Sequence, residues 1–182
     1  LLALCEEKNL PVSEIMRIRE IEFGETTSEI VNKKMTRVLE IMKDAAFSPI
    51  RQPIKSMGGL IGGEARKLSL HAQEKRGLCG ELLQKAVTYA MATLETNASM
   101  GLIVASPTAG SAGIVPGLLL AMQEHYDCSD EEIIQVLFNA SAIGYLAMRN
   151  ATVAGAVGGC QAEVGVASAM AASAAVELMG GT

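Results

Sequence analysis

Three glycine-rich segments of the sequence could bind a ligand, because each precedes a stretch with a helical pattern. They cover residues 56–65, 105–113 and 158–163. Glycine adopts positive φ without strain, and the first turn of a helix has free N–H groups and a partial positive charge. Such a segment suits a small anion such as a carboxylate or a phosphate. The hydroxyls of Ser106, Thr108 and Ser111 add donors for the same anion.

Each glycine segment taken alone also fits a tight turn or a close helix contact. No Gly-Lys-Ser or Gly-Lys-Thr follows any of them, which excludes a P-loop, and no strand pattern precedes the first, which argues against a dinucleotide-binding fingerprint. Three such segments in one apolar sequence favour a ligand, because buried backbone groups must find partners.

A cysteine stands at the start of the last predicted helix, after two glycines. This position favours the thiolate of Cys160, the form that binds metal or attacks a substrate, although a lone buried cysteine is also commonly inert. Glu163 could be an acid that caps the same helix. The remaining cysteines have no CxxC spacing and are interpreted as structural: Cys5, Cys79 and Cys128. Neither histidine, His71 or His125, is expected to be catalytic.

The elements that must position these groups are predicted to be helices. Helices are expected over 114–125, 129–148 and 163–179, over about 78–94, and directly after the first glycine segment. Few segments alternate with period two. The sequence therefore predicts an all-α fold, a compact set of helices with glycine-rich loops at their N-termini.

The first third of the chain carries further signals. Ser13 is expected to cap one helix, and residues 26–29 have the spacing of a capping box. The residues that then fall on one helical face are Val31, Met35, Val38, Leu39 and Met42. Pro49 and Pro53 predict a loop over 45–54.

Composition limits the classes of function. The 182 residues fit one domain, 1–182, and 49% of them are apolar but only 3% aromatic. A net charge of −5 with dispersed basic residues argues against nucleic acid. The stretch 96–123 has no charge, but its prolines and hydroxyls argue against a membrane span. No signal peptide opens the chain, so a cytoplasmic location is expected.

Four motifs carry a resemblance to a known family. They are Asn97–Gly101, Ser106–Gly117, Gly159–Ala167, and the early glycine motif Gly58–Ala65 with Lys67 after it. Together they resemble the α part of the iron–sulfur-dependent L-serine dehydratases, over nearly the whole chain. The form is closer to the two-chain bacterial type than to the fused type.

The resemblance implies a carbon–oxygen lyase of amino-acid degradation and gluconeogenesis. In this family water is eliminated from L-serine, and the aminoacrylate formed tautomerises and hydrolyses to pyruvate and ammonia. A [4Fe–4S] cluster held by three cysteines has one open iron, which acts as a Lewis acid on the substrate hydroxyl. Cys160 would be the first cluster ligand. The other two would lie beyond Thr182, so the sequence is expected to lack its C-terminal part, to hold no complete cluster and to be inactive alone.

The resemblance also implies roles for other positions. The residues expected to contact serine are Asn97, Ser106, Thr108, Gly110, Ser111, Gly59, Gly62 and Gly63. Those expected around these contacts and the metal are Gln161, Glu163 and Lys67. The general base would come from a β chain or β domain, or from the missing segment, within a homo- or hetero-oligomer. Ile61 stands where the family usually has threonine.

A second interpretation stays open, a non-catalytic helical module that binds an amino acid or carboxylate without metal. Cys160 separates the two, because such a module needs no thiol at a helix start. The sequence does not show how strictly L-serine is preferred to L-threonine, since a pocket rejects one methyl group only modestly.

Overall fold

The computed structural model describes residues 1–74 and 79–181, which form nine helices and no strand, and the all-α prediction is confirmed. In chain order the helices are α1 (Leu2–Lys8), α2 (Val12–Phe23), α3 (Ser28–Arg51), α4 (Glu64–Glu74), α5 (Gly80–Ala98), α6 (Ile114–Tyr126), α7 (Asp130–Asn150), α8 (Gly155–Gly158) and α9 (Cys160–Leu178). The predicted start of a helix near residue 78 lies outside the described residues.

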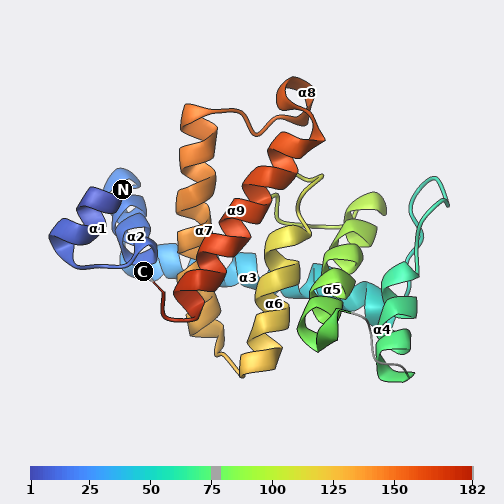
Figure 1. Ribbon diagram of the computed structural model, residues 1–182. Coiled ribbons are helices and arrows are strands. Elements are labelled where there is room, and N and C mark those ends of the chain that lie inside the picture. Colours follow the sequence, from blue (N-terminus) through green and yellow to red (C-terminus); the bar gives the residue numbers. More distant parts are fainter. Residues whose placement is uncertain (75–78, 182) are drawn as a thin grey trace.

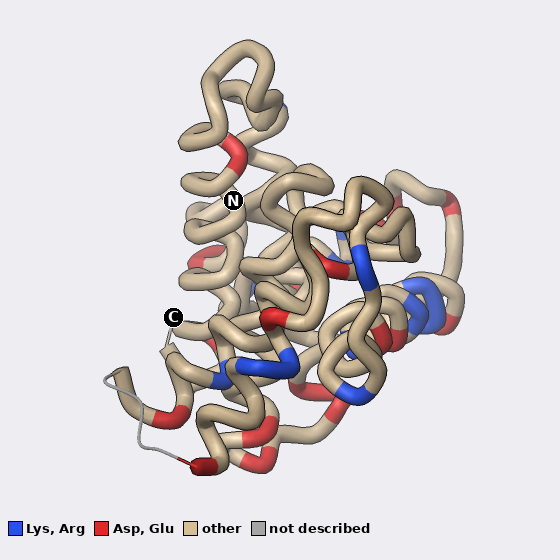
Figure 2. The backbone as a smooth tube through the Cα atoms, turned by 90° about the vertical axis from the view of Figure 1, so that its right-hand side faces the viewer, with Lys and Arg blue, Asp and Glu red and all other residues tan. Residues whose placement is uncertain are grey.

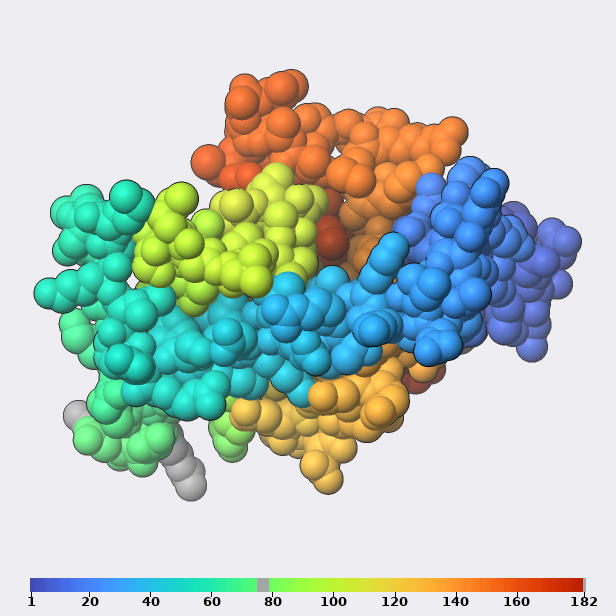
Figure 3. Space-filling view, turned by 180° about the vertical axis from the view of Figure 1, so that it is seen from behind, coloured from blue at the N-terminus to red at the C-terminus, as the bar shows by residue number. Residues whose placement is uncertain are grey.

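Six helices stand in a row, and the longest helix crosses behind them. The order in the row is α2, α7, α9, α6, α5, α4, and neighbours in this order pack against each other (Figure 1). From behind, α3 runs across the middle of the molecule (Figure 3), where it contacts α2, α7, α6, α5 and α4. This helix is therefore the common support of the row.

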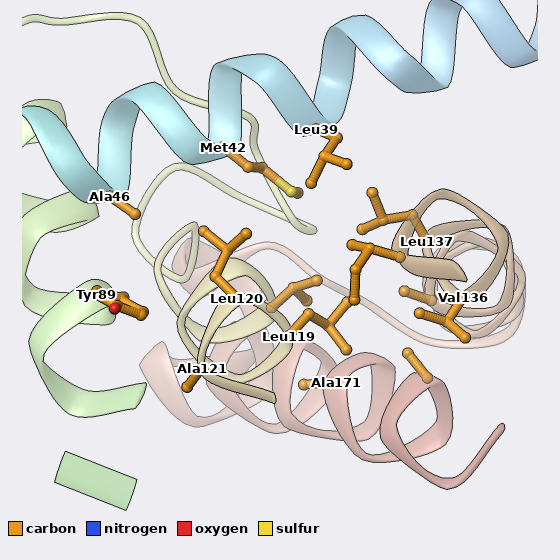
Figure 4. Packing of buried hydrophobic residues seen from close by; sticks show 14 of the residues in the cluster. Leu39, Met42, Ala46, Tyr89, Leu119, Leu120, Ala121, Val136, Leu137 and Ala171 are labelled. Atoms are coloured by element: carbon orange, nitrogen blue, oxygen red, sulfur yellow. The ribbon is translucent and has the colours of Figure 1, made fainter. Parts of the chain in front are cut away.

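The main core lies between α3 and the row. Leu39 and Met42 from α3 meet Leu119 and Leu120 from α6 and Leu137 from α7 (Figure 4). The apolar face predicted for residues 31–42 is confirmed, because its five members are either buried or packed against the two core clusters. Burial of such side chains is the main source of stability.

The helix α3 continues through a proline. A loop was expected over 45–54, and this prediction is wrong for residues 45–51, because α3 extends to Arg51 with Pro49 inside it. Residues 52–54 do lie outside the helix. A proline removes the N–H that would bond the carbonyl four residues earlier. That carbonyl belongs to Ala45, and it accepts instead from the Thr96 hydroxyl of α5 at 2.9 Å. A tertiary hydrogen bond thus replaces the missing helical one.

The helix starts agree with the sequence in part. Ser129 forms the predicted capping box with Glu132 at α7. At α3 the cap is Thr27, whose hydroxyl accepts from the Ile30 N–H at 3.4 Å, so the box predicted over 26–29 is wrong in register.

The predicted cap of α2 is also wrong. Pro11 precedes the helix, and Ser13 lies inside its first turn and is buried. The Ser13 N–H donates to Oε2 of Glu177 in α9 at 3.3 Å, and Nδ2 of Asn139 in α7 donates to the same oxygen at 2.6 Å. The carboxylate of a distant helix therefore takes the place of the expected hydroxyl cap.

Charge is uneven over the molecule. Glu163 is the single charged residue between Arg149 and Glu177, and the end of the molecule with α8 and the start of α9 is almost free of charge (Figure 2). Within the described residues, no helix is both long and apolar enough to span a membrane.

Candidate functional site

The three glycine segments lie at one end of the row, the upper end in Figure 1. The first and second lead directly into α4 and α6, as predicted. The third lies at the junction of α8 and α9, and residues 160–163 form the first turn of α9. The N-termini of α4, α6 and α9 therefore lie at the same end of the row, with α5 and α6 between α4 and α9.

A short hydrogen-bond chain joins the second glycine segment to α9. The Thr108 hydroxyl donates to Oε2 of Glu163 at 2.5 Å and lies 3.1 Å from the Ser111 hydroxyl. Thr108 has one hydroxyl proton, and it donates this proton in its hydrogen bond to Glu163. Ser111 is therefore the donor in the bond between the two hydroxyls. Glu163 does not cap its own helix, which has no side-chain cap.

Two glycines lie close to this carboxylate. A Cβ at Gly110 would lie 2.9 Å from Oε1 of Glu163, and one at Gly155 would lie 3.3 Å from the same atom. A side chain at either position would therefore require the Glu163 carboxylate to move.

Two further residues predicted to contact serine are Ser106, in the second segment, and Asn97, which bonds to it from α5. Ser106 is 4% exposed, and its hydroxyl finds no hydrogen-bond partner among the described residues. The peptide bond between Ser106 and Pro107 is cis. The side-chain amide of Asn97, in the last turn of α5, donates to the Ala109 carbonyl at 3.1 Å. Five residues predicted to contact serine are therefore gathered in one place: Asn97, Ser106, Thr108, Gly110 and Ser111.

The first glycine segment folds back on itself beside the same end of α5. Ser56 N–H donates to the Ile61 carbonyl and Gly59 N–H to the Ser56 carbonyl, both at 2.9 Å, and Met57 N–H donates to the Ala98 carbonyl at 3.3 Å. Gly59 and Gly63 have φ of 68° and 96°. At Gly62, φ is +145° and a Cβ would lie 2.1 Å from the Ile54 carbonyl oxygen.

Two glutamates that the sequence analysis missed hold this segment. Oε2 of Glu64 accepts from the Gly62 N–H at 2.6 Å, and Oε1 of Glu95 accepts from the Ala65 N–H at 2.9 Å. The Gly62 N–H, with smaller effects of the Glu95 and Lys67 side chains, lowers the pKa of Glu64. Glu64 had a weak sequence signal, an acid in the first turn of a helix. Glu95 had none, since its role depends on α4 packing against α5.

Cys160 is the first residue of α9, is exposed, and forms no disulfide. Glu163 follows one turn later, so both side chains lie on the same side of the helix. Gln161 and Lys67 are exposed, and Lys67 lies one turn after Glu64 in α4. The thiol is therefore accessible at the end of the molecule that carries the hydroxyls and the glycines.

The fold and the site define a helical chain whose cluster of hydroxyls and glycines lies where the start of α6 approaches the start of α9. The chain belongs to the family described as "Serine dehydratase alpha chain", whose model matches residues 7–182.

Named relatives agree with this assignment. The chain is 44% identical to "Probable L-serine dehydratase, alpha chain" of Bacillus subtilis, over all of this chain and 60% of that protein. It is 39% identical to "L-serine dehydratase, alpha chain" of Peptoniphilus asaccharolyticus, over all of this chain and 62% of that protein. It is 31% identical to "L-serine dehydratase 2" of Escherichia coli, over 97% of this chain and 39% of that protein. The chain thus spans less than two thirds of the length of these relatives, and no solved structure matches it.

Proposed function

We propose that the protein is the catalytic α part of an L-serine dehydratase, which eliminates water from L-serine and gives pyruvate and ammonia. The observation that carries the proposal is the family match over residues 7–182, combined with the Thr108, Ser111 and Glu163 cluster beside an accessible Cys160. The relatives named above are serine dehydratases. A cytoplasmic enzyme that works with a β chain or β domain is part of the same proposal.

Cys160 fits one ligand position of an iron–sulfur cluster. Its thiol is exposed at the start of α9, and no disulfide occupies it. Within the described residues no group of three or more Cys, His, Asp and Glu side chains could hold a metal ion. We therefore propose that the other ligands of a [4Fe–4S] cluster come from outside these 182 residues, and that the chain alone is inactive. When bound, the cluster would supply a Lewis-acid iron for the departing hydroxyl.

The residues of this chain would bind and orient the substrate. Ser106 has a buried hydroxyl that finds no hydrogen-bond partner among the described residues. Glu163 holds the Thr108 hydroxyl, which in turn bonds the Ser111 hydroxyl. Hydroxyl donors and helix N-termini suit the carboxylate of an amino acid. The general base is proposed to lie outside the chain, since neither histidine belongs to the site.

The test uses a protein of the relatives' full length that carries this chain, combined with its β partner, iron and sulfide under anaerobic conditions. Cys160→Ala is expected to abolish both the visible absorbance of the cluster and the formation of pyruvate from L-serine. The matched control is Cys79→Ala, since Cys79 is also exposed, and it should keep both. A Cys160→Ala protein with intact cluster and activity would refute the proposal.

A second measurement separates the lyase from a binding module that needs no metal. Calorimetry of L-serine with the iron-free chain is expected to show no appreciable heat of binding. Binding without iron would favour the module.

A further inference from the structure

Large apolar side chains are exposed at the tip of the first glycine segment. Leu60 is 91% exposed and Met57 is 80% exposed, and Ile61 beside them is exposed as well. None of the three belongs to a core cluster formed by the described residues. Apolar side chains that gather on a surface mark a site of interaction.

Two residues that follow α5 extend this surface. Met100 is 77% exposed, and Leu102 is exposed two residues later. The Met57 N–H donates to the Ala98 carbonyl at 3.3 Å, so the tip of the first segment lies beside this helix end. We call the five side chains the apolar patch: Met57, Leu60, Ile61, Met100 and Leu102.

Met100 has a backbone conformation that is unfavourable for its side chain. Its φ is 63°, in the left-handed region. Its N–H donates to the Asn97 carbonyl, and the Gly101 N–H donates to the Thr96 carbonyl, a helix end at which glycine is the usual left-handed residue. The methionine thus costs stability and buries nothing in return. Residues of this kind are expected at functional contacts.

Basic side chains flank the first glycine segment on both sides. All four are exposed, and none forms an ion pair with a carboxylate of the described residues. The one acid within the segment, Glu64, accepts from the Gly62 N–H. The complementary surface of a partner therefore has an apolar socket with an acidic rim. We call the four side chains the basic rim: Arg51, Lys55, Arg66 and Lys67.

The apolar patch lies next to the candidate site. Asn97, in the last turn of the helix that ends at Met100, donates to the Ala109 carbonyl of the second segment. The loop between α3 and α4 projects from the upper end of the row, where the second segment and the start of α9 also lie (Figure 1). A protein bound to the patch would therefore be close to the groups proposed to bind serine.

We propose that the apolar patch and the basic rim form the docking surface for the β chain or β domain, which binds them with an apolar socket bordered by acidic side chains. The identity of this partner rests on the proposed function. The exposed side chains, the left-handed Met100 and the unpaired rim are independent of it.

The first test measures the affinity of the β partner for a protein of the relatives' full length that carries this chain, by surface plasmon resonance. Leu60→Ser should raise Kd about tenfold or more, as expected for loss of a central apolar anchor. Phe23→Ser is the matched control and should leave Kd unchanged. Phe23 is 80% exposed at the end of α2, and α2 and α4 lie at opposite ends of the row.

The second test measures the charge of the rim. Lys55→Glu should slow association about tenfold at low salt, and the difference should nearly vanish at about 1 M NaCl, where the Debye length is about 3 Å. Lys33→Glu is the control, because Lys33 is exposed near the start of α3 and far from the rim in sequence. It should leave the association rate close to that of the unchanged protein.

Activity separates docking from a direct role of the segment in serine binding. In the reconstituted enzyme, Leu60→Ser should form little pyruvate at low concentrations of the β partner and regain the full rate as that concentration is raised. KM for L-serine should stay unchanged at saturating β partner. A substrate-binding role would instead raise KM at every concentration of the partner.

Three results would overturn the proposal. They are equal affinity of Leu60→Ser and Phe23→Ser for the β partner, no binding of the partner by the unchanged protein, and a raised KM that excess partner does not correct. Binding to phosphatidylserine vesicles that Leu60→Ser abolishes, with unchanged affinity for the β partner, would assign the patch to a membrane instead. Turnover is measured separately, so docking without any pyruvate formation would refute the serine dehydratase proposal alone.

Discussion

The hydrogen bond between Thr96 and Ala45 predicts a measurable coupling across the fold. Pro49 has no N–H for the Ala45 carbonyl, and the Thr96 hydroxyl donates to it at 2.9 Å. Ala45 is 2% exposed, so water does not replace a lost donor. Thr96→Val keeps the shape of the side chain but removes the hydroxyl. We therefore expect this substitution to lower the free energy of unfolding.

The size of the effect follows from the unpaired carbonyl. A buried acceptor left without a partner costs about 1–3 kcal/mol. The Thr96 hydroxyl also lies 3.2 Å from the Ala92 carbonyl, but that carbonyl belongs to the regular helical ladder, which supplies its own N–H. In a Pro49→Ala background, the new N–H of residue 49 bonds Ala45. There Thr96→Val should cost less than about 1 kcal/mol.

The assay is urea unfolding of the four proteins of this double-mutant cycle, followed by circular dichroism. The expected coupling is about 1–2 kcal/mol, with an unchanged m-value. Pro49→Ala alone changes both helix propensity and packing, but the cycle removes these contributions because they are the same with and without Thr96→Val. Equal costs of Thr96→Val in the two backgrounds would refute the account of how α3 passes through a proline.

Three further predictions concern the first glycine segment and the start of α7. Gly62→Ala should lower the melting temperature and speed amide exchange nearby, because φ is +145° and the Cβ would meet the Ile54 carbonyl; the strain is roughly 1–3 kcal/mol. Gly58→Ala, with open space at its Cβ, is the control, and equal effects would contradict the reasoning. Ser129→Ala should cost about 1 kcal/mol in urea unfolding, as loss of a helix cap; no loss would contradict the capping box. The Ser129 backbone N–H lowers the pKa of Glu132, so stability from Glu132 is present above about pH 4.3 and lost as pH falls through its lower folded pKa. Carbon NMR titration giving an ordinary or raised pKa would be the contrary result.

Local sequence signals predicted much of the helical framework. The capping box of α7 involves Ser129 and Glu132, which are three residues apart, so the sequence alone predicts it. The start of α6 after Gly113 was predicted in the same way, because a proline such as Pro116 is tolerated in the first turn of a helix. The passage of α3 through Pro49 depends on Thr96, and the start of α2 depends on Glu177. Such partners are far away in sequence, so no local pattern predicts them.

In the candidate site, too, local features were predictable from the sequence, whereas contacts with distant residues were not. The glycine and hydroxyl positions of the second segment were predictable, and the structure gathers them around Glu163. The sequence also suggested that the first segment presents free N–H groups to an anion. In the fold, the Gly62 and Ala65 N–H groups are bonded to Glu64 and Glu95. Whether a helix N-terminus is free for a ligand depends on which side chains the neighbouring helix brings to it.

Glu177 of α9 bonds the first turn of α2, which the ribosome makes much earlier. The ribosome makes Ser13 well before its partner, because 164 residues separate the two. Packing of α2 on α7 can begin earlier, but the first turn of α2 lacks its carboxylate until α9 leaves the exit tunnel. The hydrogen bond at the start of α2 therefore forms only after α9 has emerged from the ribosome.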